Sequence, residues 1–491
     1  LFRDFRTWKR YQGGWAQDLY VFDLARHTLE PVAPGPRTER DPMWIGDAVY
    51  FVSDRTGTLN LYRCDLATKR VEALTNSTTW DVRWASSDNR GQVVYELDGE
   101  LEVYDVAAGK ARRLAIHVPD DGLNRRPSHY PVAKWIEDFE LAPKGERALF
   151  VARGDVFTAP IEKGATRNLT NSSGAHEKHA RWSPCGRTIA YVSDRTGEEQ
   201  LWLEEQDGGG PPVQVTAGFR VQLMAPAWSP DGRRIAIADK DGRVHVVTLA
   251  DRRVVEVADD AYGRVDDYAW SPDGAHLAFS LREANGYRAL WIWSAADGRT
   301  RRVTDGFFDV DTPAWDPAGK YLYVLSRREF APQISDLEWN YAGNRGTGIF
   351  AFALRKDLPS PFPPQSDEVA LGEEKPAAEK APAPKDKPAA KSPAAPVVID
   401  FDGLAARGVR VPVESDNITA LAVTADYLVY STAGAPFNGR ASYEKPKLRL
   451  FDLKKREGSV LVDDAGGWAL SWDGAKALVR TGGNYELWDV K

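Results

Sequence analysis

The chain contains 491 residues, of which 43% are hydrophobic and 27% charged, and it carries a net charge of -7 with a pI near 5.7. These proportions are typical of a globular protein, and the acidic balance disfavours nucleic acid, which usually binds to a basic face. No run of about 18 apolar residues is present, so we expect no membrane-spanning helix and no membrane partner.

The first 125 residues contain an incomplete set of strand-rich units. Residues 41–75 form one unit and residues 80–114 another, while residues 18–32 look like the tail of a third. The phrase Ser-Asp-Arg-Thr-Gly at residues 53–57 recurs at residues 193–197, which links this region to the rest of the chain. A stretch with four prolines or glycines, residues 118–131, is the natural boundary between the two regions.

A second, longer region repeats the phrase Trp-Ser-Pro-Asp-Gly, which starts at Trp228 and again at Trp270. Weaker copies start at Trp182 and Trp315, and others occupy residues 139–145 and 470–474. From Phe139 to Trp315 the five anchors are separated by 43, 46, 42 and 45 residues. A fixed period of this length with several short strands inside each unit is typical of a β-propeller.

Each repeat is expected to form one blade of four antiparallel strands. In the unit of Trp228, a turn with proline and glycine is followed by strand-like runs at residues 234–238, 244–248 and 253–257. The tryptophan at each anchor is expected to fill the space between adjacent blades. Further anchors near Leu421 and at Leu470 bring the count to seven.

One low-complexity segment, residues 359–396, interrupts the repeat between Trp315 and Leu421. It is dense in Pro, Ala, Lys and Glu, a composition that cannot bury a core, so we expect it to be disordered. Residues 401–413 would then return as the last strand of the fifth blade. The final unit reaches only its third strand, at residues 487–490.

These patterns predict an all-β chain that consists of two β-propellers in tandem. Residues 1–125 would be the last blades of a first ring, because two and a half blades cannot close a ring and leave bare strand edges. The missing blades are expected upstream of Leu1. Residues 126–491 would form a seven-bladed ring of four-stranded antiparallel blades.

Catalytic and metal-binding signatures are absent from the sequence. It lacks G-x-S-x-G, the Walker pattern and H-E-x-x-H. His176 and His179 stand three residues apart, but no Cys or carboxylate cluster with ligand spacing surrounds them. Arg125 and Arg126 could clamp a carboxylate or be a solvated pair in a linker. We predict no catalytic residue, no metal and no cofactor in this chain.

Polar side chains just before the anchors are the candidate functional residues. In a propeller such residues should lie on the innermost strands, near the mouth of the channel. A polar rim there could select or guide a ligand, although simple solvation of loop ends also explains polar residues at these positions and is the favoured interpretation. The six candidates are His179, Arg181, Asp266, Asp267, Asp309 and Asp311.

Several other phrases resemble tricorn-like serine peptidases. Residues 11–18 (YQGGWAQD) resemble a phrase of their first propeller, and residues 146–157 (ERALFVARGDVF) are similar to the opening of their second. Residues 354–357, 359–362 and 399–404 also fit. The resemblance implies a six-bladed propeller, a seven-bladed propeller, a small mixed domain, a PDZ domain and a catalytic domain. The catalytic Ser, His, Ser and Glu of the family lie beyond the second propeller, so none is carried over.

The resemblance implies a cytoplasmic peptidase that trims peptides, whose propeller channels admit substrate and release product. Its partners would be peptide substrates and the downstream PDZ and catalytic domains of the same chain, and a homo-oligomer is open. Two alternatives remain: a TolB-like propeller that binds proteins without catalysis, and a gate for a prolyl-oligopeptidase-like hydrolase. A periplasmic or exported location is the alternative to the cytoplasm.

Overall fold

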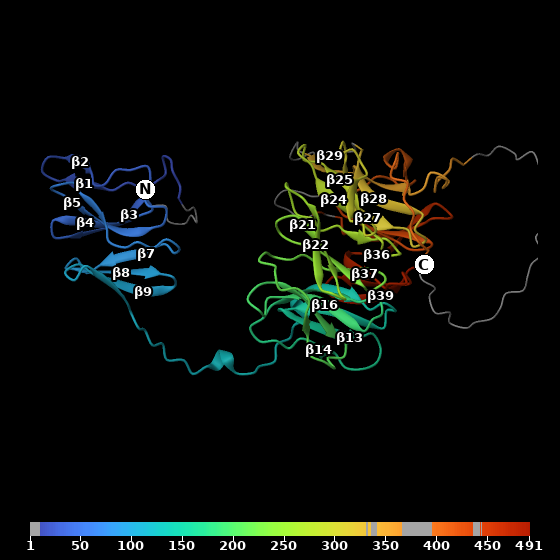
Figure 1. Cartoon of the computed structure of the whole chain (residues 1–491), viewed down its shortest axis with the longest axis horizontal. Coiled ribbons are helices and arrows are strands. Elements are labelled where there is room, and N and C mark those ends of the chain that lie inside the picture. Colours follow the sequence, from blue (N-terminus) through green and yellow to red (C-terminus); the bar gives the residue numbers. More distant parts are fainter. Residues whose placement is uncertain (1–9, 330–331, 335–340, 366–394, 436–441, 443) are drawn as a thin grey trace, which may run out of the picture. The chain divides into compact units, whose positions relative to one another are not determined.

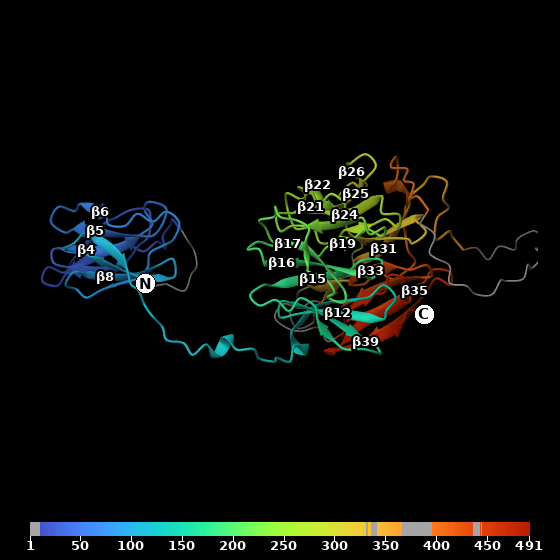
Figure 2. The same ribbon diagram turned by 60° about the horizontal axis from the view of Figure 1, so that its bottom comes forward.

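The computed structural model describes residues 10–329, 332–334, 341–365, 395–435, 442 and 444–491. The chain divides into two compact units, Leu1–Ser128 and His129–Lys491, and Figures 1 and 2 show that both consist of strands. In the described part, the helices are three short 3-10 turns: η1 (Leu123–Arg125), η2 (Ala133–Trp135) and η3 (Ala405–Arg407). The predicted all-β fold is confirmed, and the division falls three residues after the predicted boundary.

The first unit contains one two-stranded and two four-stranded antiparallel sheets. Its strands are β1 (Tyr20–Asp23) and β2 (Thr28–Pro31); β3 (Glu39–Ile45), β4 (Ala48–Ser53), β5 (Asn60–Asp65) and β6 (Val71–Ala73); and β7 (Arg83–Ser87), β8 (Gln92–Leu97), β9 (Glu100–Asp105) and β10 (Lys110–Arg113). The two larger sheets pack face to face around Tyr50, Leu61 and Tyr95. The other face of the β3–β6 sheet packs on the first hairpin through Phe51 and Cys64. These sheets are the two units and the tail that the sequence predicts.

The second unit contains seven consecutive sheets, which we call blades one to seven, and a small hairpin. The blades comprise, in chain order, β11 (Ile136–Leu141), β12 (Arg147–Ala152), β13 (Asp155–Pro160) and β14 (Arg167–Asn168); β15 (Glu177–Trp182), β16 (Thr188–Ser193), β17 (Gln200–Glu205) and β18 (Val213–Gln214); β19 (Ala227–Trp228), β20 (Arg234–Ala238), β21 (Arg243–Thr248) and β22 (Arg253–Asp259); β23 (Ala269–Trp270), β24 (His276–Arg282), β25 (Arg288–Ser294) and β26 (Arg299–Arg302); β27 (Asp309–Trp315), β28 (Tyr321–Arg327), β31 (Thr347–Ala353) and β32 (Gly408–Arg410); β33 (Ile418–Val423), β34 (Tyr427–Thr432), β35 (Lys447–Asp452) and β36 (Glu457–Asp463); and β37 (Ala465–Leu470), β38 (Lys476–Thr481) and β39 (Asn484–Asp489). Six blades have four strands in the described residues, and blade seven has three.

The blades form a closed ring in which the first strand of each blade is the inner one. Neighbouring first strands contact one another from β11 through β15, β19, β23 and β27 to β33, and β37 returns to β11. Aromatic packing joins the last blade to the first, because the Tyr485 ring lies 5.0 Å from Phe139 and 4.9 Å from Phe150, edge to face. Leu478 adds an apolar contact with Leu141. The ring therefore closes by side-chain packing.

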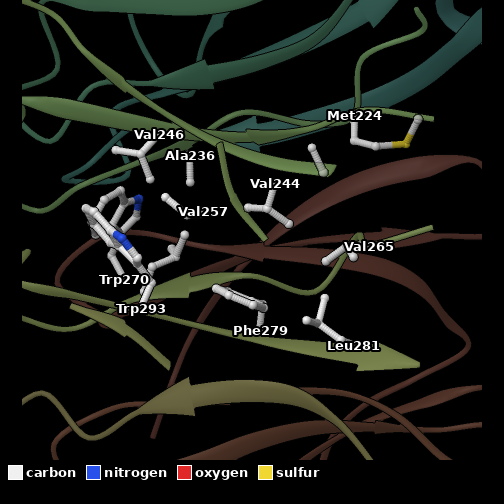
Figure 3. Packing of buried hydrophobic residues seen from close by; sticks show 12 residues of the cluster. Met224, Ala236, Val244, Val246, Val257, Val265, Trp270, Phe279, Leu281 and Trp293 are labelled. Atoms are coloured by element: carbon white, nitrogen blue, oxygen red, sulfur yellow. The ribbon is translucent and has the colours of Figure 1, made fainter. Parts of the chain in front are cut away.

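The anchor tryptophans fill the space between neighbouring blades, as predicted. Trp270 packs between blades three and four, in a cluster with Val246 and Phe279 (Figure 3). Its indole Nε1 donates a hydrogen bond of 3.0 Å to the carbonyl of Ala227 in the preceding blade. Trp315 makes the equivalent bond to Ala269, also at 3.0 Å. Trp228, Trp270 and Trp315 thus contribute both apolar burial and a hydrogen bond across a blade interface, whereas Nε1 of Trp182 is buried and has no hydrogen-bond partner among the described residues.

Two blades have their anchor at a different residue from the one that the sequence suggests. In blade one, the Ala142 amide bonds the Arg147 carbonyl as the Ser183 amide bonds Thr188 in blade two. Leu141, rather than Phe139, therefore occupies the position of Trp182. By the same criterion the anchor of blade six is the last residue of β33, because the following residue, Thr424, bonds Tyr427. The sequence analysis predicts Phe139 as the anchor because it is the aromatic residue of β11.

Blade five contains the predicted interruption. Its strand order β27-β28-β31-β32 confirms that the chain leaves the blade and returns for a last strand. A hairpin of β29 (Pro332–Ile334) and β30 (Tyr341–Asn344) lies between β28 and β31. The expected disorder of residues 359–396 falls largely outside the described residues. Its described flanks are held in place, since Phe362 packs on Phe451 and the Val397 amide donates to Asp273 at 2.7 Å.

Candidate functional site

A half-open pocket of about 580 Å³ lies on the inner strands of blades one and two. Strands β11 and β15 supply most of its charged side chains, and the connections of blades two and three supply the rest. A volume of this size lies within the range of ligand pockets. The lining residues are Glu137, Asp138, Val151, His176, Lys178, His179, Arg181, Glu199, Gln222 and Ala225.

An ion pair between the two inner strands forms the wall of the pocket. Nη1 of Arg181 donates to Oδ2 of Asp138 at 2.7 Å, and Nδ1 of His179 lies 3.7 Å from the same oxygen. Burial by itself would raise the pKa of Asp138, but Arg181 and His179 outweigh it and lower that pKa to about 2. Asp138 is therefore ionised at any physiological pH and holds the guanidinium in place.

Arg181 and Lys178 each keep hydrogen-bond donors that can bind a ligand. Among the described residues, Arg181 uses only Nη1, which bonds Asp138 and the Ala180 carbonyl. Its Nε and Nη2 form the edge with which a guanidinium binds a carboxylate in bidentate fashion. The ammonium of Lys178 pairs with Glu199 at 2.7 Å and keeps further donor capacity. The pocket can thus bind carboxylates and peptide carbonyl groups through β15.

A β-bulge aims the side chains of β15. The pairing with β16 shifts register between Lys178 and Arg181, and His179 within the bulge has a φ of 54°. A non-glycine residue in this region is uncommon, and a bulge redirects the side chains around it. Thr312 stands at the equivalent position of blade five, also with a φ of 54°. The bulge is therefore a shared feature of the inner strands in the ring.

Glu140 is a charged residue of the inner wall that sequence reasoning missed. It accepts a hydrogen bond from the Trp182 amide, and burial raises its pKa to about 7 although Arg181 opposes the shift. It is the residue before the anchor of blade one, as Arg181 is in blade two. Five other blades have alanine in this position, namely Ala227, Ala269, Ala314, Ala422 and Ala469. Once the anchors are set in the correct register, this contrast would have revealed the charged pair.

Asp267, a predicted rim residue, lies in a different place from the pocket. It is largely buried between blades four and five, where it accepts hydrogen bonds from Ser280 and from the Thr312 amide. Burial raises the pKa of Asp267 to about 7 despite these hydrogen bonds. Its role in the structure is to hold two inner strands together, including the strained Thr312.

The other three predicted aspartates each pair with an arginine. Asp309 accepts from Nη1 of Arg327 at 2.9 Å, and Asp311 lies 3.5 Å from Nη2 of the same side chain. Burial raises the pKa of Asp311, while Arg327 opposes the shift. Asp266 is exposed and pairs with Arg264 at 3.2 Å. The structure thus brings His179 and Arg181 together in one pocket and places the four aspartates apart from it.

The described residues lack two features, a cluster of potential metal ligands and a membrane-spanning helix. They include no group of three or more His, Cys, Asp or Glu side chains placed to hold a metal ion. None of their helices has the length and apolar character required to cross a lipid bilayer. The two cysteines are free, Cys64 buried and Cys185 exposed.

Comparison with known proteins assigns both units to one family. Residues 136–491 match the model of the tricorn protease second beta propeller domain, and residues 1–110 match that of its N-terminal beta propeller domain. A tricorn protease homolog of Saccharolobus solfataricus is 25% identical over 493 residues, which are 100% of this chain and 43% of that protein. Tricorn protease homolog 1 of Streptomyces coelicolor is 28% identical over 501 residues, 99% of this chain and 46% of that protein.

The solved tricorn protease has the same fold. Its crystal structure superposes with a TM-score of 0.69 at 17% identity and covers 98% of this chain and 45% of the tricorn chain. The chain therefore spans less than half the length of these relatives. Since one family model alone matches most of the chain, the chain belongs to the tricorn protease family, of which it comprises the propeller region.

Proposed function

We propose that this chain is the non-catalytic propeller region of a serine-type peptidase, and that its propellers guide or sieve peptides on their way to and from the catalytic domain. The observation that carries the proposal is the closed ring of seven blades with a charged pocket on its inner strands. The PDZ and catalytic domains would follow on the same chain. The proposal also includes a cytoplasmic location and assembly into a homo-oligomer.

A ring of this kind selects substrates by their shape. An extended peptide exposes backbone carbonyl groups and carboxylates along its whole length, whereas a folded domain is far wider than a strand. The free edge of Arg181 and the ammonium of Lys178 offer donors to such groups along one wall. Asp138 and Glu199 hold these bases in position, so little side-chain entropy is lost when a peptide binds.

The first experiment tests the peptidase itself. The parent protein is expressed at full length and incubated with an unstructured peptide, with and without a serine-directed inhibitor. We expect inhibitor-sensitive cleavage of the free peptide and none when the same sequence is held inside a folded domain. Absence of inhibitor-sensitive cleavage would remove the enzyme proposal. It would favour the alternative, a TolB-like propeller that binds proteins without catalysis.

The second experiment tests the pocket. Arg181→Gln removes the free guanidinium edge and should raise KM several-fold while kcat changes little, because it weakens binding without touching the reacting atoms. Arg233→Gln is the matched control, since Arg233 is an exposed arginine at the blade edge opposite to the pocket. Thermal unfolding of both variants shows whether the fold is intact. Equal kinetics for a folded Arg181→Gln variant and the control would exclude the pocket from substrate handling.

A further inference from the structure

Three sheets of the chain share a serine–arginine pair at the end of their second strand. The arginine follows the serine by two residues, and its Nε donates a hydrogen bond to the serine hydroxyl at 3.3, 3.2 and 2.9 Å, respectively. The three arginines are therefore held in the same way. They are Arg55 in the first unit, Arg195 in blade two and Arg328 in blade five.

Aromatic rings hold the plane of each of these guanidinium groups. The guanidinium carbon of Arg195 lies 4.7 Å from the centroid of the Trp202 ring. That of Arg328 lies 4.5 Å from Phe350, which has the equivalent place on the third strand, and 5.2 Å from Phe308. Stacking of this kind orients a guanidinium and leaves its edge available for hydrogen bonds.

The three sheets differ in the carboxylate that meets the arginine. In the first unit and in blade two, Nη2 of the arginine donates to a buried glutamate at 3.0 and 3.1 Å, namely Glu39 and Glu177. Each glutamate lies on the first strand, where it pairs with the serine of the second strand. In blade five the residue that pairs with Ser326 is Val310. Arg328 accordingly forms no ion pair with any described residue.

The carboxylates on either side of Ser326 and Arg328 bind other bases. Glu329 pairs with Arg410 at 2.9 Å. Two carboxylates of β27 pair with Arg327 at 2.9 and 3.5 Å, namely Asp309 and Asp311. These groups are engaged and leave the charge of Arg328 without a direct partner.

Asp305 is a further carboxylate that acts on Arg328. Its Oδ1 accepts a hydrogen bond from the Phe307 amide at 3.1 Å, and it forms no ion pair within the described part of the chain. Burial lowers the pKa of Arg328, although Asp305 opposes the shift. The guanidinium is thus partly desolvated by its two rings and only weakly compensated, and a carboxylate from a ligand would relieve both conditions.

Arg328 lies at the edge of the ring where the charged pocket opens. It belongs to the connection between the second and third strands of blade five, and Glu199 of the pocket lies in the same connection of blade two. Because the strands of every blade alternate in direction in the same order, these connections share one edge. Arg328 is exposed there, whereas the side chains of Arg55 and Arg195 are only 25% and 19% exposed. A ligand at this edge can therefore reach Arg328.

We propose that Arg328 binds a carboxylate of a peptide, in the place that a glutamate fills beside its two counterparts. The choice of a peptide rests on the proposed function, whereas the carboxylate follows from the guanidinium itself. Ser326 occupies Nε, and the two Nη groups form the fork that binds a carboxylate with two parallel hydrogen bonds. The C-terminal group of a peptide and an acidic side chain both supply this chemistry.

Equilibrium binding to the full-length parent protein tests the proposal. After inactivation with a serine-directed inhibitor, the protein is titrated into three rhodamine-labelled unstructured peptides of equal length, and fluorescence anisotropy is recorded. The first peptide is neutral with an amidated C-terminus, the second has the same sequence with a free C-terminus, and the third is amidated and contains two glutamates. We expect the second or the third to bind about tenfold more tightly than the first, and the tighter one identifies the source of the carboxylate.

Arg328→Gln should abolish this preference, because it weakens the carboxylate peptide about tenfold and changes the neutral peptide less than about twofold. Arg282→Gln is the matched control, since Arg282 is an exposed arginine at the end of β24, at the same edge, and forms no ion pair with a described residue. Equal losses for the two variants would reveal a general effect of charge and overturn the proposal. A folded Arg328→Gln variant that keeps the preference would overturn it as well.

Val310→Glu restores the glutamate that the other two sheets contain. In the folded variant, the new carboxylate should occupy Arg328 and lower the affinity for the carboxylate peptide as Arg328→Gln does. Thermal unfolding shows whether each variant is folded, and if Val310→Glu is not, Arg328→Gln and its control decide. Absence of any preference for a carboxylate in the native protein would also overturn the proposal. Because binding is measured without turnover, the result is independent of whether the parent cleaves peptides.

Discussion

The two units contain the same buried polar cluster in different surroundings. In the second unit, Glu177 receives hydrogen bonds from Ser193 at 2.8 Å and from Arg195 at 3.1 Å on one oxygen, and from Ser172 at 2.5 Å on the other. In the first unit, Ser53 and Arg55 bond Oε1 of Glu39 in the same way.

The second oxygen of Glu39, Oε2, is buried and has no hydrogen-bond partner. Pro34 stands five residues before Glu39, where Ser172 stands before Glu177, so the first unit lacks the second hydroxyl donor. Burial raises the pKa of Glu39 to about 7, although Arg55 opposes the shift. The same Glu-Ser-Arg motif therefore has both carboxylate oxygens hydrogen-bonded in the second unit and only one in the first, and the deciding contact comes from outside the motif.

The inner-strand tryptophans differ in the same manner. Trp44 and Trp182 pair with equivalent positions of the adjacent strand, yet Trp44 is 53% exposed and Trp182 only 1%. Trp182 packs on Leu149 and Val151 of blade one, whereas Trp44 bonds the nearby Gly46 carbonyl. A tryptophan at this position is a core residue only where the inner strands of a preceding blade cover it.

The largest expected effect comes from the two tryptophans. Trp182→Ala should destabilise the second unit by about 4 kcal/mol, because it leaves a cavity between two blades. In the 491-residue chain, Trp44→Ala should cost the first unit less than about 1 kcal/mol, because no inner strand of a preceding blade covers Trp44 in the described residues. Hydrogen exchange with mass spectrometry measures the opening free energy of each unit separately. Equal losses would contradict the difference in packing.

The second effect concerns the arginines of the buried clusters. Arg195→Ala should destabilise the second unit by about 3 kcal/mol, because it removes the cation beside a buried carboxylate. Arg55→Ala should cost less at neutral pH, since Glu39 then carries a proton. The same exchange experiment checks both variants. A larger loss for Arg55→Ala would show that Glu39 is fully ionised.

Glu39 should make the stability of the first unit depend on pH. Its folded pKa of about 7 exceeds the unfolded value near 4.3, so the stabilising contribution is complete below about pH 4 and is lost as the pH rises to 7. Glu39→Gln should abolish this loss and leave the first unit about 2 kcal/mol more stable than the native chain at pH 8. Glu177→Gln should instead destabilise the second unit by about 2 kcal/mol, because it weakens charge-assisted hydrogen bonds. Urea unfolding across this pH range provides the measurement, and an identical response of the two variants would refute the comparison.

The smallest expected effect comes from Ser172→Ala, which should make the Glu177 cluster resemble the Glu39 cluster. Ser172→Ala removes the hydroxyl that donates to the second oxygen of Glu177 and should cost about 1 kcal/mol. The second unit should then lose stability as pH rises through neutrality, as we expect of the first. Thr170→Ser, two residues away, is the conservative control. If the stability of the second unit depends on pH as it does in the native chain, another donor replaces Ser172.

Most of the fold could be predicted from the sequence because the repeat is regular. The strands around Trp228 and Trp270 appear at the predicted residues, and the interruption of blade five and the short last blade were visible from the spacing. The sequence predicts the anchor of blade one at the aromatic Phe139, whereas the structure has it two residues later, at the aliphatic Leu141. Because of this shift, the sequence analysis did not identify Glu140, which is the neighbour of Arg181 on the inner wall.

The candidate site was less predictable than the fold. Sequence reasoning selected His179 and Arg181 but could not separate them from Asp267, which follows the same spacing rule. Position along a repeat indicates which strand a side chain occupies, whereas its partners belong to the neighbouring blade. Asp138 and Thr312 lie more than forty residues from Arg181 and Asp267, and no local pattern connects them.

The sequence by itself determined the repeated four-stranded antiparallel sheets of the second unit, the turn at each Trp-Ser-Pro-Asp-Gly phrase and the place of the interruption, because strand periodicity and turn chemistry act over a few residues. Only the tertiary structure decided how the ring closes through Tyr485, which buried carboxylates find a second donor and which charged groups form the pocket. Those outcomes depend on contacts between blades, where burial and hydrogen bonding join residues that are distant along the chain.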